Sequence, residues 1–169
     1  MAKKILIMRH AKSSWDDISL QDFDRPLNKR GNRDAPRMGK YLSKMGVVPD
    51  QIVSSPAKRA MSTIKLASVE MGFEPDSIAW DDDLYFRGGG AYLNAIRQMD
   101  TDSQTVMAVG HYPMVEEVIS ILTGKMPIKH FGTATVACLQ TEISEWQEVE
   151  AGCCSLLWMI KPKELSQKE

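Results

Sequence analysis

Two of the three histidines in this 169-residue sequence, and two of its arginines, come just after short apolar segments. Arg9 and His10 follow residues 3–8, Arg59 lies one helical turn after 51–54, and His111 follows 105–109 and Gly110. The planar guanidinium of arginine matches the oxygens of a phosphate bidentately, and an imidazole can act as a nucleophile. Because no carboxylate is among them, these four side chains would form an electropositive site that suits a dianion.

Apolar segments alternate with helix-like segments, and this alternation would bring the four side chains together. The expected strands are residues 3–8, 51–54, 77–80 and 105–109, each followed by apolar residues at helical spacing. Repeated strand–helix units predict an α/β fold, a three-layer αβα sandwich whose mostly parallel sheet is covered by helices on both faces. Ligands bind beyond the carboxyl ends of strands in such sheets, so the four side chains are predicted to share one rim.

The expected helix boundaries support this order of elements. Asn28 is the predicted N-cap of the first helix and Gly46 its C-terminal glycine, whereas Pro36 requires either a kink or a later start. Ser55 is expected to cap the next helix, with Pro56 at its first position. In that helix Arg59 occupies the first turn, where free N–H groups favour an anion and side chains lean toward the N-terminus.

After the last expected helix, the runs 134–139 and 154–160 predict an edge hairpin across an acidic loop. The chain is expected to form a single domain over residues 1–162, followed by a charged, frayed tail over 163–169.

Composition excludes several classes of function. A formal net charge of -1 argues against nucleic acid as a partner, since phosphate-backbone binding needs a net basic surface. No apolar run approaches the 18 residues of a membrane span. The apolar start of the chain meets Arg9 too soon for a signal-peptide core, so we expect a cytoplasmic location.

Other residues that could do chemistry are interpreted as structural. His130 does not follow a predicted strand, and Gly88-Gly89-Gly90 lacks the lysine and the glycine spacing of a phosphate loop. Cys153 and Cys154 are consecutive, so they are expected to pack rather than to form a bridge. No C-x-x-C or H-x-x-x-H spacing occurs, and no zinc site is therefore expected.

Three motifs of the chain resemble the signatures of the histidine phosphatase superfamily, which has the phosphoglycerate mutase-like fold. The order and spacing of these motifs agree over roughly residues 4–125, and the short chain is most similar to the small SixA-type phosphohistidine phosphatases. The motifs are Met8-Arg9-His10-Ala11-Lys12, Ser54-Ser55-Pro56-Ala57-Lys58-Arg59-Ala60-Met61-Ser62-Thr63 and Val109-Gly110-His111, with Arg25-Pro26-Leu27-Asn28 before the first helix. The superfamily's usual R-H-G is here R-H-Ala11, which requires an ordinary, negative φ at Ala11.

The resemblance implies a mechanism for the four side chains. His10 would attack phosphorus and become a phosphohistidine, which water then hydrolyses. Arg9 and Arg59 would bind the non-bridging oxygens and stabilise the charge of the transition state, and His111 would donate to the same oxygens. No metal or other cofactor is implied, because the arginines supply the positive charge.

The general acid is expected from the segment between the second and third motifs. Asp83 is the best positional match there, and a solvated acidic turn is the alternative interpretation. An imidazole leaving group has a conjugate-acid pKa near 6.5 and needs far less protonation than an alkoxide. A weak or absent acid would therefore be tolerable for phosphohistidine and harmful for sugar phosphates.

These features predict a metal-independent phosphatase acting on phosphohistidine in a protein. The segment 72–105 is too short for a lid domain, which leaves a rim that a protein surface could approach. Two alternatives remain: a phosphatase of small phosphate esters, and a phosphate- or phosphoprotein-binding module without turnover.

Overall fold

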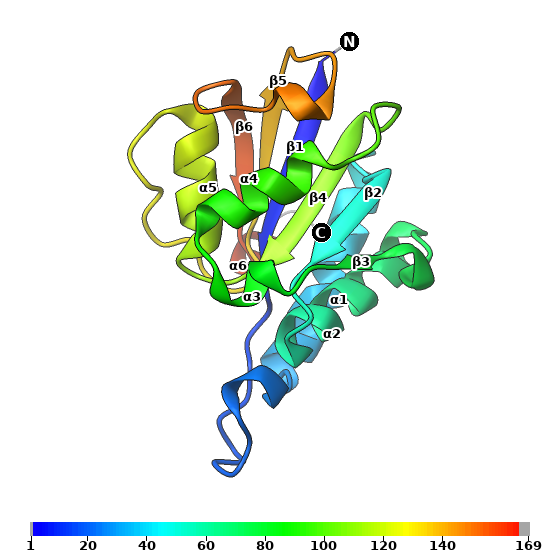
Figure 1. Ribbon diagram of the computed structural model, residues 1–169. Helices are drawn as coiled ribbons and strands as arrows, with labels where there is room; N and C mark the ends of the chain where they lie inside the picture. The colour runs from blue at the N-terminus through cyan, green and yellow to red at the C-terminus, as the bar shows by residue number, and fades with distance from the viewer. Residues whose placement is uncertain (1, 166–169) are drawn as a thin grey trace.

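A single six-stranded sheet forms the centre of the protein, which is described here over residues 2–165 of a computed structural model (Figure 1). The strand order is β3-β2-β4-β1-β5-β6. The strands are β1 (Lys3–Arg9), β2 (Gln51–Ser54), β3 (Ala79–Trp80), β4 (Thr105–Gly110), β5 (Val136–Thr141) and β6 (Cys154–Ile160). The strands β1 to β4 pair in parallel, whereas β5 and β6 run antiparallel at one edge. The predicted mostly parallel sheet and the edge hairpin are both confirmed.

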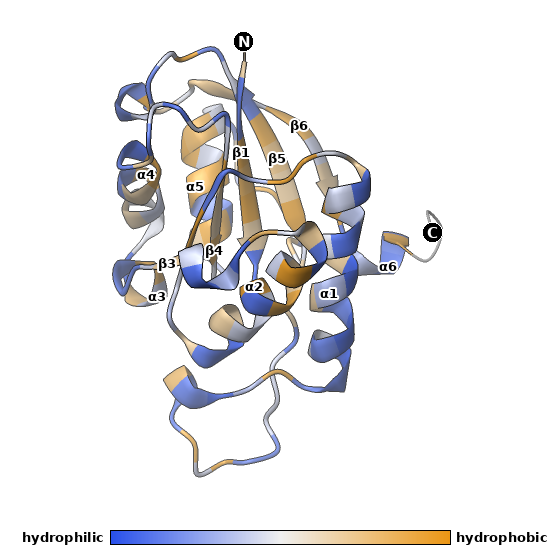
Figure 2. Ribbon diagram, turned by 90° about the vertical axis from the view of Figure 1, so that its right-hand side faces the viewer, coloured by the Kyte–Doolittle hydropathy of each residue, from blue (hydrophilic) through white to orange (hydrophobic). Residues whose placement is uncertain are grey.

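Helices cover both faces of this sheet, as the three-layer prediction requires. The helices are α1 (Lys29–Lys44), α2 (Lys58–Met71), α3 (Asp83–Phe86), α4 (Gly89–Arg97), α5 (Met114–Thr123) and α6 (Pro162–Leu165), with short 3-10 turns η1 (Asp22–Asp24), η2 (Pro75–Ser77) and η3 (Trp146–Glu148). Figures 1 and 2 show α1 and α2 on one side of the sheet and α4 and α5 on the other.

The alternation of side chains along β1 divides the interior into two cores. Ile5 and Ile7 belong to the core that contains the apolar residues of α4 and α5, whereas Leu6 and Met8 belong to the core of α1 and α2. All four are fully buried, because consecutive residues of a strand point to opposite faces. β1 is thus held from both sides, and the residues at its carboxyl end are held with it.

The helix α1 begins where the sequence predicts. The Asn28 side chain accepts a hydrogen bond from the Gly31 N–H and caps the helix, and Gly46 follows it with a φ of +68°. Pro36 lies inside the helix, so the alternative of a later start is wrong. Burial of Met38 and Leu42 on the same helix offsets the roughly 3 kcal/mol that an internal proline costs.

Two predicted boundaries differ from the structure. The helix α2 begins at Lys58 rather than at Pro56, and its N-cap is Ala57, which offers no side-chain acceptor. Ser55 is therefore not the N-cap, although its hydroxyl accepts from the Ala57 N–H at 3.2 Å and also lies beside His111 in the site described below. At the other end, the expected tail begins inside α6, where Leu165 is buried against the core of α1 and α2. The remainder of that tail, 166–169, lies outside the described residues.

The adjacent cysteines do not form a disulfide. Cys153 and Cys154 are both free, with their sulfur atoms 3.5 Å apart. No helix within residues 2–165 is long and apolar enough to cross a membrane.

Candidate active site

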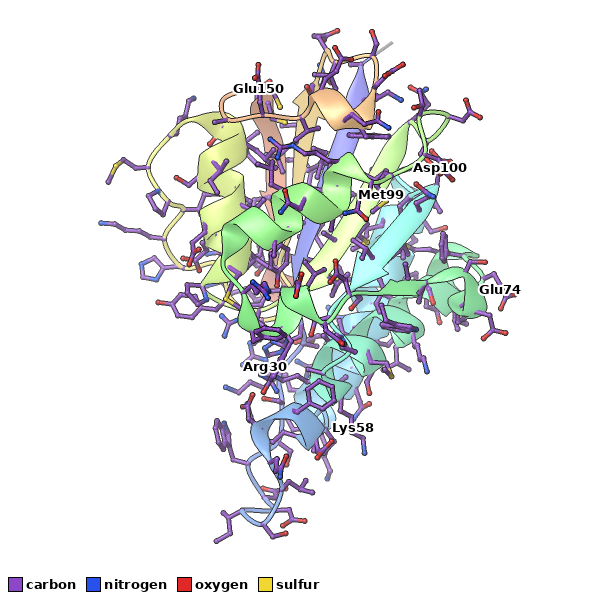
Figure 3. The ribbon with its side chains drawn as sticks, in the orientation of Figure 1. Arg30, Lys58, Glu74, Met99, Asp100 and Glu150 are labelled. Carbon is purple, nitrogen blue, oxygen red and sulfur yellow. The ribbon has the colours of Figure 1, made fainter. Side chains whose placement is uncertain are left out.

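The four predicted side chains meet where β1 and β4 end. The register pairs Arg9 with Gly110, so His10 and His111 follow at adjacent strand ends, and their ring centroids lie 5.2 Å apart. Arg59 reaches the same place from the first turn of α2, and its charge acts on both imidazoles. Figure 3 shows the sheet from the side. The labelled Arg30 and Lys58, in the first turns of α1 and α2, lie near the end of the sheet that carries the site, and Asp100 lies near the opposite end.

His10 is a neutral imidazole, and one of its two ring nitrogens makes a hydrogen bond to the backbone. Its Nδ1 lies 2.7 Å from the Ala11 carbonyl oxygen, to which only a protonated nitrogen can donate. The tautomer set by this bond leaves a lone pair on Nε2. Burial is the largest of the effects that lower the His10 pKa to about 3, and His111 and the two arginines lower it further. The ring is therefore neutral and nucleophilic at physiological pH.

Alanine can replace the usual glycine at position 11 of the first motif only if its φ is negative, and the structure meets this condition. Within residues 2–165, only His130 and Ala134 among the non-glycine residues have a positive φ, so the backbone of Ala11 is ordinary. The Ala11 N–H donates to Thr63 Oγ1 at 2.9 Å, and that hydroxyl donates to the Arg59 carbonyl at 2.6 Å. These bonds link the loop after β1 to α2 and set the position of His10 relative to Arg59.

His111 is positioned through its backbone and its ring. Its N–H donates to the hydroxyl of buried Tyr92 at 3.1 Å, and that hydroxyl donates to the Leu84 carbonyl at 2.6 Å. A Cβ at Gly110 would lie 1.8 Å from the Tyr92 hydroxyl, so only glycine fits there. The Nε2 of His111 lies 2.8 Å from Ser55 Oγ. Burial and the charge of Arg59 lower the pKa of His111 to about 3.

The two arginines are fixed in different ways. Arg9 donates from Nη1 to the Phe131 carbonyl at 3.1 Å, and its guanidinium lies 5.4 Å from the centre of the Tyr112 ring. Arg59 donates from Nη1 to the Asp22 carbonyl at 2.7 Å and from Nη2 to Asp22 Oδ2 at 3.0 Å. Burial lowers the pKa of Arg9, but a guanidinium remains protonated in proteins.

Three buried nitrogens of this cluster make no hydrogen bond within the described part of the chain. They are Nε of Arg9, Nε of Arg59 and Nδ1 of His111. A buried donor without a partner costs about 1–3 kcal/mol, and native structures contain few of them. Three from separate elements around one neutral histidine indicate a ligand with several acceptor oxygens.

The structure places a further carboxylate, Asp22, beside the four predicted side chains. Asp22, in η1, accepts from Arg59 and also from the Tyr85 hydroxyl at 2.8 Å. Burial alone would raise its pKa, but the hydrogen bonds from Tyr85 and Arg59 lower it overall. The ring of Tyr85 also lies edge-on to His111, with centroids 5.5 Å apart.

Asp22 and Ser55 carried only weak signals in the sequence. Asp22 is one of several aspartates in a polar segment that extends beyond the sheet between β1 and α1 (dark blue in Figure 1). Its place three residues before Arg25, the first residue of the motif that precedes the first helix, is the available signal. The Ser55-Pro56 pair predicts a helix start, and this local pattern does not indicate the contact between Ser55 and His111.

The Asp83 carboxylate is bonded to a residue outside this cluster. Its carboxylate accepts from Arg87 Nε at 2.9 Å in an exposed ion pair. It also lines a cavity with residues of β2 and α4, among them Val53 and Ala95. Tyr85, two residues later on α3, is the residue of this segment that contacts His111.

Gly88 and Gly89 serve the start and the packing of α4. Gly88 is the N-cap of α4, and the Gly89 N–H donates to Glu117 Oε2 at 3.0 Å. A Cβ on Gly89 would lie 2.7 Å from the Glu117 Cβ, so α4 and α5 approach closely at this point. No group of three or more His, Cys, Asp or Glu side chains that could hold a metal ion occurs within residues 2–165.

The site and the fold were compared with known proteins. Residues 5–84 match the profile of the histidine phosphatase superfamily (branch 1). An uncharacterized chloroplastic protein of Arabidopsis thaliana is 35% identical over 160 residues, which cover 89% of this chain and 72% of that protein. An uncharacterized protein of Mycobacterium tuberculosis is 27% identical over 165 residues, which cover 92% of this chain and 100% of that protein.

Solved structures show the same similarity over the whole fold. A candidate phosphohistidine phosphatase SixA from Agrobacterium tumefaciens is 27% identical with a TM-score of 0.79, covering 95% of this chain and 98% of that one. A second, from Nakamurella multipartitia, is 26% identical with a TM-score of 0.83, covering 96% of this chain and 97% of that one. The structure of a protein histidine phosphatase SixA complexed with tungstate has the same fold at 23% identity, with a TM-score of 0.80 and coverage of 96% and 99%.

Proposed function

The chain belongs to the histidine phosphatase superfamily, and from this premise we propose that it is a metal-independent phosphatase that works through a phosphohistidine intermediate on His10. The observation that carries the proposal is the set of three buried donors, on Arg9, Arg59 and His111, around a neutral His10. A phosphoryl group offers acceptor oxygens to all three donors and an electrophilic phosphorus to the imidazole.

The reaction proceeds in two steps, transfer of the phosphoryl group to His10 and its hydrolysis by water. The Nε2 lone pair of His10 forms a bond to phosphorus while the bond to the leaving group breaks, and the leaving group keeps that electron pair. In the second step a water oxygen attacks phosphorus, the N–P bond breaks, and the electron pair returns to Nε2. The proton of the water passes to solvent or to the released phosphate.

The buried donors act mainly in the transition state. Negative charge spreads over the three non-bridging oxygens as the phosphoryl group transfers, and donors held in advance need no reorganisation at that moment. Arg9 and Arg59 supply charge, and His111 supplies a further donor from Nδ1. The Ser55 hydroxyl favours this tautomer when it donates to His111 Nε2.

Asp22 and Asp83 are both poorly suited to protonate a leaving group. Asp22 is bonded to Arg59 and Tyr85, and its lowered pKa keeps it ionised. Asp83, the acid implied by the family resemblance, is paired with Arg87. We therefore infer that neither aspartate is an effective general acid, which favours substrates whose leaving group departs without one.

Phosphohistidine in a protein is the substrate class that this reasoning favours. When the other ring nitrogen of the phosphohistidine carries a proton, the leaving group is a neutral imidazole, whose conjugate acid has a pKa near 6.5, and it departs without a further proton. The names of the similar solved structures, phosphohistidine phosphatases, support the same class. A phosphatase of small esters is the alternative, and the sequence similarity of part of the chain to phosphoglycerate mutases favours it: one from Streptomyces avermitilis is 36% identical over 66 residues, which cover 38% of this chain and 26% of that enzyme.

Trapping of the intermediate tests the proposal. The protein is mixed with a ³²P-labelled phosphohistidine protein or aryl phosphate and quenched in detergent at alkaline pH, because phosphohistidine is labile in acid. Label is expected on the peptide that contains His10, and both label and turnover should disappear in His10→Ala. The matched control is His130→Asn, an exposed position whose positive φ suits asparagine, which should still give label on the His10 peptide. Turnover near the wild-type rate in His10→Ala would overturn the mechanism.

The same assay separates an enzyme from a binding module. A non-catalytic phosphate-binding protein would retain the phosphorylated ligand without labelling His10 or releasing phosphate. Comparison of a phosphohistidine protein with a panel of phosphate esters then decides between the two substrate classes.

A further inference from the structure

A cavity of about 770 Å³ opens beside Arg9. Its lining comes from the start of α5 and from the segment that follows that helix, which returns toward the site along one side of the molecule (yellow in Figure 1). Its lining residues include Arg9, Tyr112, Glu116, Met126, Ile128 and Phe131. Its volume lies in the range of sites that hold small organic groups.

The side chains of this cavity are mainly apolar and are not all needed for folding. Phe131 is fully buried and Ile128 is half-buried against the core of α4 and α5. Tyr112 and Met126, in contrast, are 58% and 86% exposed, so the fold gains little from them. Exposed large apolar side chains gathered around a cavity indicate a binding site for an apolar group.

Arg9 connects this cavity to the phosphoryl site. The Phe131 carbonyl accepts from Arg9 Nη1, and the Tyr112 ring lies under the same guanidinium. The unpaired Nε of Arg9 belongs to the donor set of the active site. A phosphoryl group bound by Arg9 therefore lies next to the cavity, and a group attached to that phosphoryl can enter it.

The charged side chains around the cavity have both signs and do not favour the binding of a second ion there. Glu116, Lys129 and His130 line it in addition to Arg9, so acidic and basic side chains are both present. A second anion close to Arg9 would meet Glu116, and the charge of Arg9 acts on that carboxylate. The apolar side chains thus determine what the cavity prefers.

We propose that this cavity is a subsite for an uncharged, apolar group, preferably aromatic, that the substrate carries beside the phosphoryl group bound by Arg9. The proposal rests on the proposed phosphatase function and specifies its substrate class. The same chemistry can come from an aryl ester or from an apolar side chain next to a phosphohistidine in a polypeptide.

A binding experiment that needs no turnover tests the subsite. The probes are methylphosphonate and 1-naphthylmethylphosphonate, whose C–P bonds the enzyme cannot hydrolyse, and calorimetry measures their affinities for the wild type. The naphthyl compound is expected to bind at least tenfold more tightly. Tenfold corresponds to about 1.4 kcal/mol, which burial of roughly 60 Å² of apolar surface supplies.

Two variants test whether the tighter binding of the naphthyl compound depends on this cavity. Met126→Ser and Ile128→Ser, which add no charge beside Arg9, are expected to weaken naphthylmethylphosphonate binding at least tenfold and to leave methylphosphonate binding unchanged. The matched control is Met45→Ser, another exposed methionine, at the C-cap of α1, which should change neither affinity. Met126 is so exposed that its variant is expected to keep the wild-type melting temperature, which guards against a loss caused by unfolding.

The outcomes separate the subsite from the proposed function. Equal affinities for the two phosphonates, or a preference that survives in both cavity variants, would overturn the subsite even if the enzyme hydrolyses phosphate. A preference that the variants abolish supports the subsite even if no hydrolysis is found. Phosphohistidine peptides with leucine or serine beside the phosphorylated residue then identify the source: a leucine preference in kcat/KM that Met126→Ser removes indicates a polypeptide, and its absence indicates an ester.

Discussion

Lowering the pH should destabilise this protein through the two histidines of the site. Burial lowers the pKa of both His10 and His111 to about 3, whereas an unfolded histidine has a pKa near 6.5. Between these values the unfolded chain binds more protons than the folded one, so stability falls as the pH falls. The contribution is complete above about pH 7.5 and is lost as the pH decreases toward 3.

The size of the effect follows from the two pKa values. At about pH 4.5, each histidine removes roughly 2.7 kcal/mol from the free energy of unfolding relative to neutral pH. Both together remove about 5 kcal/mol, which is comparable to the whole stability of a small domain. Carboxylates also titrate in this range, so the histidine contribution must be isolated by a variant.

Urea unfolding in phosphate-free buffer at about pH 7.5 and 4.5 measures the loss. In His10→Gln, which has no titrating ring at this position, the loss should be smaller than in the wild type by about 2–3 kcal/mol. His130→Asn serves as the control, because its side chain is exposed and its positive φ suits asparagine. An equal loss in His10→Gln and the wild type would show that His10 is not held neutral by burial.

Further predictions concern the reaction itself. Arg9→Ala and Arg59→Ala should each lower kcat/KM at least a hundredfold, or about 2.7–4 kcal/mol, and a loss of only a few-fold would place them outside the transition state. Activity should survive EDTA, and its loss would reveal a metal requirement. The rate should depend steeply on leaving-group pKa, with aryl phosphates and phosphoramidates fast and alkyl phosphates slow. Asp83→Asn should scarcely affect the fast substrates; efficient alkyl hydrolysis that collapses in Asp83→Asn would favour the small-ester alternative.

The strands, most helix ends and the meeting of Arg9, His10, Arg59 and His111 could be predicted from the amino-acid sequence alone. Period-2 and period-3.6 patterns are local, so residues 3–8 and 105–109 could be identified as strands without knowledge of their neighbours. Once the sheet is mostly parallel, its topology alone brings His10 and His111 to one edge. The roles of Asn28 and Gly46 at the ends of α1 could be predicted in the same way, because helix capping depends on a few adjacent residues.

Only the tertiary structure decided which side chains complete the site. Asp22 pairs with Arg59 across 37 residues of sequence, and Ser55 reaches His111 across 56. Ser55 has the local features of a helix cap, and only the position of His111 at the next strand end gives its hydroxyl another partner. The helix α3 is set against the sheet so that Tyr85, rather than Asp83, contacts His111. Such partnerships depend on how loops and short helices pack in three dimensions, and no spacing within one segment of the sequence encodes them.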